Sequence, residues 1–90
     1  AMDQNYPNPF NPVTMIRYTV PERSQVRLVV TDALGREVAE LVNKRVEKGR
    51  YDVQFDGNRL SSGTYIATIW ISGIESGLTF RKTIKMALNK

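Results

Sequence analysis

The sequence predicts an all-β fold in which short antiparallel strands pack as a sandwich. Several stretches alternate apolar and polar side chains with a period of two, which is typical of strands that bury one face. Turn-forming residues recur roughly every 8 to 12 positions. No stretch combines helical periodicity with the caps of a good helix. Together these observations favour a seven-stranded antiparallel β-sandwich of immunoglobulin type.

The first two strands are expected at residues 14–20 and 26–31. In the first, one face carries Ile16, Tyr18 and Val20. The other carries Met15, Arg17 and Thr19. Pro21 ends this strand, because proline has no N–H to donate to a neighbouring strand. In the second strand, valine and leucine again occupy alternate positions, so each strand offers one face to a core.

A tight turn is expected at residues 32–35, which read Asp-Ala-Leu-Gly. Aspartate first and glycine fourth is the composition that a type I turn prefers, since the carboxylate accepts hydrogen bonds from nearby N–H groups. Residues 36–42 fit either one helical face or a strand. So short a segment, directly after a hairpin turn and without an N-cap, makes a poor helix, and we predict a strand. Residues 43–49 are expected to form an exposed, charged loop.

Three further strands are expected at residues 51–55, 64–72 and 78–88. The first of them alternates most clearly. The second is apolar on both faces, which is typical of a central strand or of one whose outer face meets a partner. In the third, Lys82 alone interrupts the apolar face, and Leu60 is expected to plug the loop that precedes residues 64–72.

The composition argues against catalysis. The chain contains neither cysteine nor histidine, so it lacks a thiol nucleophile, a disulfide, the usual general base and the commonest metal ligand. Asp52 and Asp56 share a strand face but lie about 13 Å apart at strand rise, too far for a glycosidase pair. The Asp-Gly-Asn run at 56–58 lacks the later glutamate of a calcium loop. We therefore expect no catalytic residue, metal or cofactor.

Charge and hydropathy exclude two further classes of partner. The net charge is +4, but the basic residues are spread among acidic ones and alternate with apolar neighbours, which places them on the solvent side of strands. We expect no nucleic acid. No apolar run approaches the roughly 20 residues that span a bilayer, so no direct membrane insertion is expected either.

Trp70 is the one candidate for binding a small ligand. It lies on the outward face of its strand together with Ile66. It could form a sugar-stacking platform, as in a carbohydrate- or cell-wall-binding accessory module of an extracellular enzyme. The alternative is that Trp70 packs beneath a loop or a partner.

The run at residues 5–12 holds three of the four prolines. Each proline pushes the residue before it toward extended geometry, so the run cannot be helical. It is a stiff lead-in that could lay Tyr6 and Phe10 against the core. We interpret residues 1–3 as a cloning remnant or linker and residues 4–90 as a single domain.

Several motifs stand in a characteristic order and spacing. They are Asn5-Tyr-Pro-Asn-Pro-Phe-Asn-Pro, Ile16-Arg-Tyr, Asp32-Ala-Leu-Gly-Arg-Glu-Val, Gly49, Ser62-Gly-Thr-Tyr and Lys85-Met-Ala-Leu. With these motifs the chain resembles the C-terminal sorting domain, type A, of the bacterial type IX secretion system, and the resemblance covers nearly all of residues 4–90. The immunoglobulin-like domain of flagellar hook-capping proteins shares part of the pattern, but the final Lys-Met-x-Leu strand favours the sorting domain.

The resemblance implies a signal domain that follows a secreted cargo in the same chain. In that family the domain is recognised in the periplasm, the folded cargo passes the outer-membrane translocon, and a sortase usually removes the domain and attaches the cargo to a surface lipopolysaccharide. The cargo thus reaches the outer-membrane surface or the extracellular space, and the cut would fall near residues 1–5. The residues implied in recognition are Pro7, Asn8, Pro9, Gly35, Gly63, Tyr65, Lys85, Met86, Leu88 and Lys90.

The last strand fits such a role physically. A strand at the edge of a sheet offers unpaired backbone groups, to which a partner can add a further strand. A signal of this kind needs no pocket.

Overall fold

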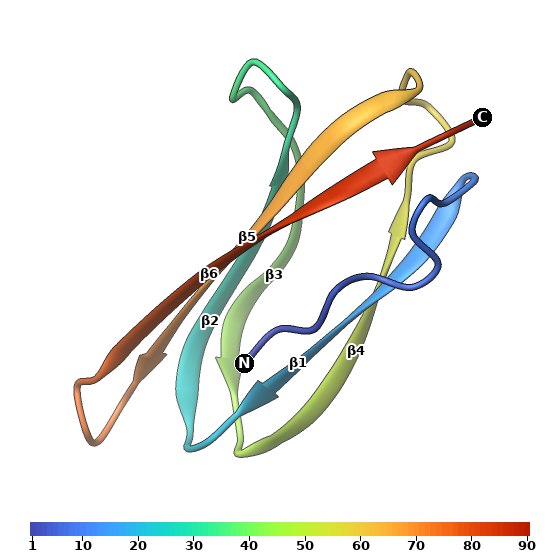
Figure 1. Ribbon diagram of the computed structural model, residues 1–90. Helices are drawn as coiled ribbons and strands as arrows, with labels where there is room; N and C mark the ends of the chain where they lie inside the picture. The colour runs from blue at the N-terminus through green and yellow to red at the C-terminus, as the bar shows by residue number, and fades with distance from the viewer.

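The computed structural model describes residues 1–90 and has six strands in two antiparallel sheets. One sheet has four strands in the order β3-β2-β5-β6, and the other pairs β1 with β4 (Figure 1). The all-β class is confirmed. There is no helix, and hence none that could cross a membrane. The strands are β1 (Val13–Val20), β2 (Ser24–Thr31), β3 (Glu37–Val46), β4 (Gly49–Asp56), β5 (Gly63–Gly73) and β6 (Thr79–Leu88).

The predicted count of seven strands is wrong, because the structure has six. One further segment pairs with the strands but is not itself a strand. It is the amino-terminal segment, residues 1–12, which runs along β1 and then crosses to β6 (Figure 1). It forms only isolated bridges, at Met2–Tyr18, Tyr6–Met15 and Phe10–Leu88. Its three prolines have no N–H to donate, so a continuous ladder cannot form there.

The region between the second and fourth strands differs in part from the prediction. Strand rather than helix after the turn is confirmed, because β3 begins at Glu37. The loop expected at 43–49 is wrong, since β3 continues to Val46 and β4 starts at Gly49. Val42 and Val46 are buried, whereas the charged residues between them are exposed. Such charges are compatible with a strand here because β3 is an edge strand, whose side chains reach solvent.

The core lies between the two sheets. The central position predicted for β5 is confirmed, since it pairs with both β2 and β6. Its inward side chains are all buried, at Tyr65, Ala67, Ile69 and Ile71. Phe80 stands on the apolar face predicted for residues 78–88 but is 41% exposed. The β5–β6 hairpin extends past the β1–β4 pair, which leaves that end of the sheet uncovered (Figure 1).

The first three residues pack onto this core. Met2 is fully buried, with 0% of its surface exposed. The carbonyl of Ala1 accepts a hydrogen bond from the Thr19 N–H at 2.7 Å, and the Asp3 N–H donates to the Arg17 carbonyl at 2.8 Å. The amino-terminal segment is therefore fastened along the free edge of β1.

The turn predicted at residues 32–35 is present. The Gly35 N–H donates to the Asp32 carbonyl at 3.0 Å, and one Asp32 carboxylate oxygen accepts from the N–H groups of Leu34 and Arg36 at 2.9 and 3.0 Å. Gly35 has a φ of 84°, a left-handed conformation that strains any residue with a Cβ. The backbone of the turn, and not its packing, requires glycine at this position.

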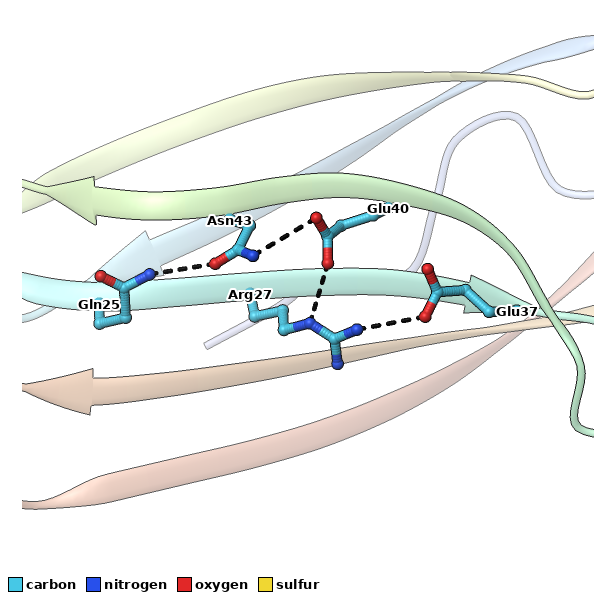
Figure 2. Close-up of polar contacts among 5 residues, drawn as sticks. All are labelled: Gln25, Arg27, Glu37, Glu40 and Asn43. Carbon is cyan, nitrogen blue, oxygen red and sulfur yellow. Dashed lines mark hydrogen bonds and ion pairs between the residues drawn. The ribbon is translucent and has the colours of Figure 1, made fainter.

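Polar side chains tie β2 to β3 on the outer face of the larger sheet. Figure 2 shows the Arg27 guanidinium donating to Glu40 at 3.0 Å and to Glu37 at 3.2 Å. Asn43 bonds to Glu40 and to Gln25 in the same row. These groups are substantially exposed, so each ion pair stabilises the fold by less than about 1 kcal/mol. They connect β2 to β3 through the Arg27 side chain.

Acid is expected to weaken the domain partly through Asp32. The Arg36 N–H holds the pKa of the Asp32 carboxyl below its ordinary 3.8. Because the folded-state pKa is the lower one, this contribution is complete above 3.8 and is lost as the pH falls through the lowered pKa. Urea midpoints measured between neutral pH and about pH 2.5 should fall less steeply for Asp32→Asn than for the parent. Urea midpoints that fall equally steeply with pH in both proteins would contradict the assignment of this acid sensitivity to Asp32.

Candidate functional site

The two ends of the chain meet along the second half of β6. The Phe10 N–H donates to the Ala87 carbonyl at 2.9 Å, and the Asn89 N–H donates to the Phe10 carbonyl at 3.0 Å. The Ala87 N–H donates to the side-chain oxygen of Asn8 at 2.9 Å. The Gln4 side-chain amide donates to the Lys85 carbonyl at 2.7 Å. We call residues 4–10 and 85–90 together the terminal junction.

The junction changes the expectation for the last strand. β6 does lie at the edge of its sheet. Its outer edge from Lys85 to Asn89, however, is already occupied by the proline-rich segment. Strand addition at this half would first require removal of that segment.

A buried polar cluster turns the proline-rich segment from β1 toward β6. Asn5 is 2% exposed, and its amide donates to the Pro7 carbonyl and to the Thr14 hydroxyl, both at 3.1 Å. The Thr14 hydroxyl donates to the same Pro7 carbonyl at 2.9 Å. No buried side-chain polar atom lacks a partner. Since an unpaired buried polar group costs about 1–3 kcal/mol, this cluster favours a single path for the chain.

Phe10 anchors the junction in the core. Its ring is 1% exposed and lies 5.8 Å, centroid to centroid, from the ring of Phe55. Gly57 permits this packing: a Cβ at that position would lie 3.0 Å from a Leu88 methyl carbon and 3.3 Å from the Phe10 ring. The Gly57 N–H also donates to the Pro12 carbonyl at 2.8 Å. Close approach of three segments therefore favours glycine here, since a Cβ would have to displace the Leu88 and Phe10 side chains by a few tenths of an ångström.

The start of β5 supports the junction from the other side. Gly63 pairs with Leu88, and Tyr65 pairs with Met86. The Tyr65 hydroxyl donates to the Ser61 carbonyl at 2.6 Å.

The last residue is tied to the same loop. The Lys90 N–H donates to the Ser62 hydroxyl oxygen at 3.0 Å, and the Lys90 ammonium donates to the Asn58 carbonyl. The end of the chain is thus held over the β4–β5 loop.

The structure separates the predicted recognition residues by exposure. Tyr65, Met86 and Leu88 are buried, at 7%, 1% and 2% exposed, so they position the strand and cannot touch a partner of the folded domain. Gly35 lies in the β2–β3 turn, which shares a shallow hollow of about 270 Å³ with residues 61–65 but makes none of the junction's hydrogen bonds. The members that reach solvent at the junction and beside it are Pro7, Asn8, Pro9, Gly63, Lys85 and Lys90.

Sequence reasoning missed several residues that build this site. Asn5 stands inside a motif that it identified, but the period-two rule predicts no burial in a proline-rich segment. Packing against the core, expected for both aromatic residues of that segment, is confirmed for Phe10, which is 1% exposed, and is wrong for Tyr6, which is 81% exposed. Gly57 stands in the Asp-Gly-Asn run at 56–58, which was compared only with a calcium loop. Ala87 carries no side-chain signal, because its part in the junction is made by its backbone.

Trp70 lies apart from the terminal junction, in the middle of the outer face. Arg27 on β2 and Arg81 on β6 are its direct neighbours across the sheet. Their guanidinium carbons lie 5.4 and 5.9 Å from the centre of the ring, and 36% of the residue is exposed. Both contacts have the geometry of cation–π pairs. A sugar ring stacking on Trp70 would have to compete with these two cations.

The comparisons with known proteins agree with the motifs. A family model described as "Secretion system C-terminal sorting domain" matches residues 4–85 of the 90-residue chain. Neither a curated protein nor a solved structure matches. The matched range contains the proline-rich segment, both glycine turns and β6 as far as Lys85.

Proposed function

The chain belongs to the family of secretion system C-terminal sorting domains, and from that premise we propose that the terminal junction is the surface by which the type IX secretion machinery recognises it. Such a domain is the sorting signal of type IX secretion. It is attached to an upstream cargo and directs that cargo to the cell surface or the extracellular space. The family is not a catalytic one, and we assign the chain no catalysis of its own.

One observation supports the junction as the recognised surface. The Asn8 side chain and the Phe10 backbone bond to the backbone of Ala87, so two motifs from opposite ends of the chain form one surface. The unfolded chain does not hold these motifs together. A receptor that contacts both would therefore select domains that have folded, and the exposed Lys85 and Lys90 would attract carboxylates on that receptor.

We extend the proposal to the route and its components. The outer-membrane translocon binds the folded domain, which does not itself insert into the membrane, and a sortase then removes it. Ala1 and Asp3 bond to β1, and Met2 is buried. A protease therefore could not take this segment into its active-site groove while the segment stays attached to the domain. We therefore place the cut on the amino-terminal side of Met2. Amino-terminal sequencing of the released domain would locate it.

Export of a reporter tests the proposed surface. The full chain is fused behind a periplasmic reporter in a bacterium with a type IX system. Asn8→Ala removes one hydrogen bond and costs about 1 kcal/mol, so the domain stays folded. We expect surface delivery by the parent domain and reduced delivery by Asn8→Ala and by the double variant Lys85→Glu/Lys90→Glu.

Asn43→Ala provides the matched control. Asn43 is likewise an exposed asparagine with side-chain hydrogen bonds, but it lies on β3, outside the terminal junction. It should be exported like the parent. Retention of the parent fusion would contradict the sorting function, whereas normal export of both junction variants would contradict only the proposed surface.

A further inference from the structure

The outer edge of β6 is free along its first half. In an antiparallel pair, alternate residues direct both backbone groups away from the partner strand. Ala87 directs its N–H and carbonyl to the outer edge, where Asn8 and Phe10 bond them. By the same alternation Arg81 and Thr83 direct theirs outward, and no hydrogen bond from another segment ends on them. This half is an open template for a further strand.

An apolar hollow lies beside the free edge. Its volume is about 270 Å³, and its apolar wall includes Pro21, Ile71, Leu78 and Phe80. Leu78 is 73% exposed and Phe80 is 41% exposed. Phe80 is also the neighbour of Arg81 on β6, so the hollow and the unpaired backbone groups belong to one continuous surface.

The only carboxylate that lines this hollow is already engaged. The Glu22 carboxylate accepts a hydrogen bond from the Ser76 N–H at 3.2 Å. Bonding to Ser76 lowers the pKa of Glu22, so the carboxylate stays ionised to a lower pH than a free glutamate would. Ser24, Thr79 and Ala1 also line the hollow, and the ammonium of Ala1 donates to the Thr19 carbonyl at 3.0 Å. The apolar part of the wall is available to apolar side chains.

The charge on β6 indicates the chemistry of the occupant. The strand carries Arg81, Lys82 and Lys85, no aspartate and no glutamate, and none of the three cations takes part in an ion pair. A second copy of this chain paired at the same edge would bring like charges together, which is destabilising. An acidic strand would complement them.

We propose that the free edge of β6 at residues 79–83 binds an extended acidic segment of a partner protein as an added strand. Alternate side chains of that segment lie on opposite faces. The apolar ones contact Phe80 and Leu78 at the hollow, and the carboxylates face Arg81 on the outer side. The proposal rests on the proposed function in one respect, since a sorting signal must be bound by a protein.

The test uses the full chain and a synthetic probe. The probe is a fluorescent peptide of about eight residues that alternates valine with glutamate and has blocked ends. The control peptide has lysine in place of each glutamate. We expect the acidic peptide to raise the fluorescence anisotropy at low salt and to slow hydrogen exchange at the Arg81 and Thr83 amides. The lysine peptide should do neither.

Two variants locate the binding. Arg81→Glu should weaken binding of the acidic peptide about tenfold, whereas Lys44→Glu, at a cation of β3 that forms no ion pair, should leave it unchanged. Thr83→Pro removes an outward N–H without breaking a bond to β5 and should abolish binding in a domain that circular dichroism shows to be folded. If that variant fails to fold, amide exchange in the parent decides.

Three results would overturn the proposal. The first two are equal binding of both peptides and no binding of either peptide. The third is slow exchange of the Arg81 and Thr83 amides without any peptide, in a domain that sedimentation shows to be a dimer. The binding assay contains no secretion component. It can therefore fail while the parent fusion is exported, and export can fail while the peptide binds. The two proposals are tested separately.

Discussion

Replacing Phe10 with alanine is expected to lower the free energy of unfolding by about 3–5 kcal/mol, the usual cost of removing a buried phenylalanine. The ring is 1% exposed and packs on Phe55 and beside Gly57. A domain of this size has about 5–15 kcal/mol in total. Phe10→Ala should therefore leave a marginally stable domain whose proline-rich segment has lost its anchor. Urea unfolding, followed by circular dichroism, measures the change.

Tyr6→Ala is the matched control in the same proline-rich segment. Tyr6 is also an aromatic residue beside a proline, but 81% of it is exposed. Its removal should change the stability by no more than about 0.5 kcal/mol. Equal urea midpoints for the two variants would show that burial of Phe10 does not anchor the segment.

Deleting residues 85–90 is expected to unfold the domain. The deletion removes Met86 and Leu88, two nearly fully buried side chains, each of which would cost about 2–5 kcal/mol if truncated to alanine. It also removes the pairing of β6 with the start of β5 and with Phe10. The summed loss is comparable with the whole stability of the domain. Thermal unfolding should show no cooperative transition.

The shorter deletion, of Asn89 and Lys90, is the control for this loss of folding. It removes the bonds to the Phe10 carbonyl and to the Ser62 hydroxyl but no core side chain. We expect a loss of about 1–3 kcal/mol and a folded product. A cooperative transition in the longer deletion, at a temperature near that of the shorter one, would contradict the packing described for β6.

Local patterning was sufficient for most of the strands. The apolar residues on both faces of residues 64–72 indicated a central strand, and β5 is central. The aspartate and glycine at 32 and 35 indicated a turn that is present. Residues 43–46 were misinterpreted as part of a loop, because they include the charged residues Lys44 and Arg45. An edge strand tolerates such charges and then loses the alternation on which the prediction depends.

The sequence by itself determined the all-β class, the absence of thiol and imidazole chemistry, and, through the order of its motifs, the family. Such features depend on residues that are close together in the chain. Only the tertiary structure decided that the proline-rich segment occupies one half of the β6 edge and leaves the other half open. That arrangement joins Asn8 and Phe10 to Ala87 through backbone hydrogen bonds. Backbone groups are the same in every residue except proline, so the local sequence pattern does not predict which distant segments will pair.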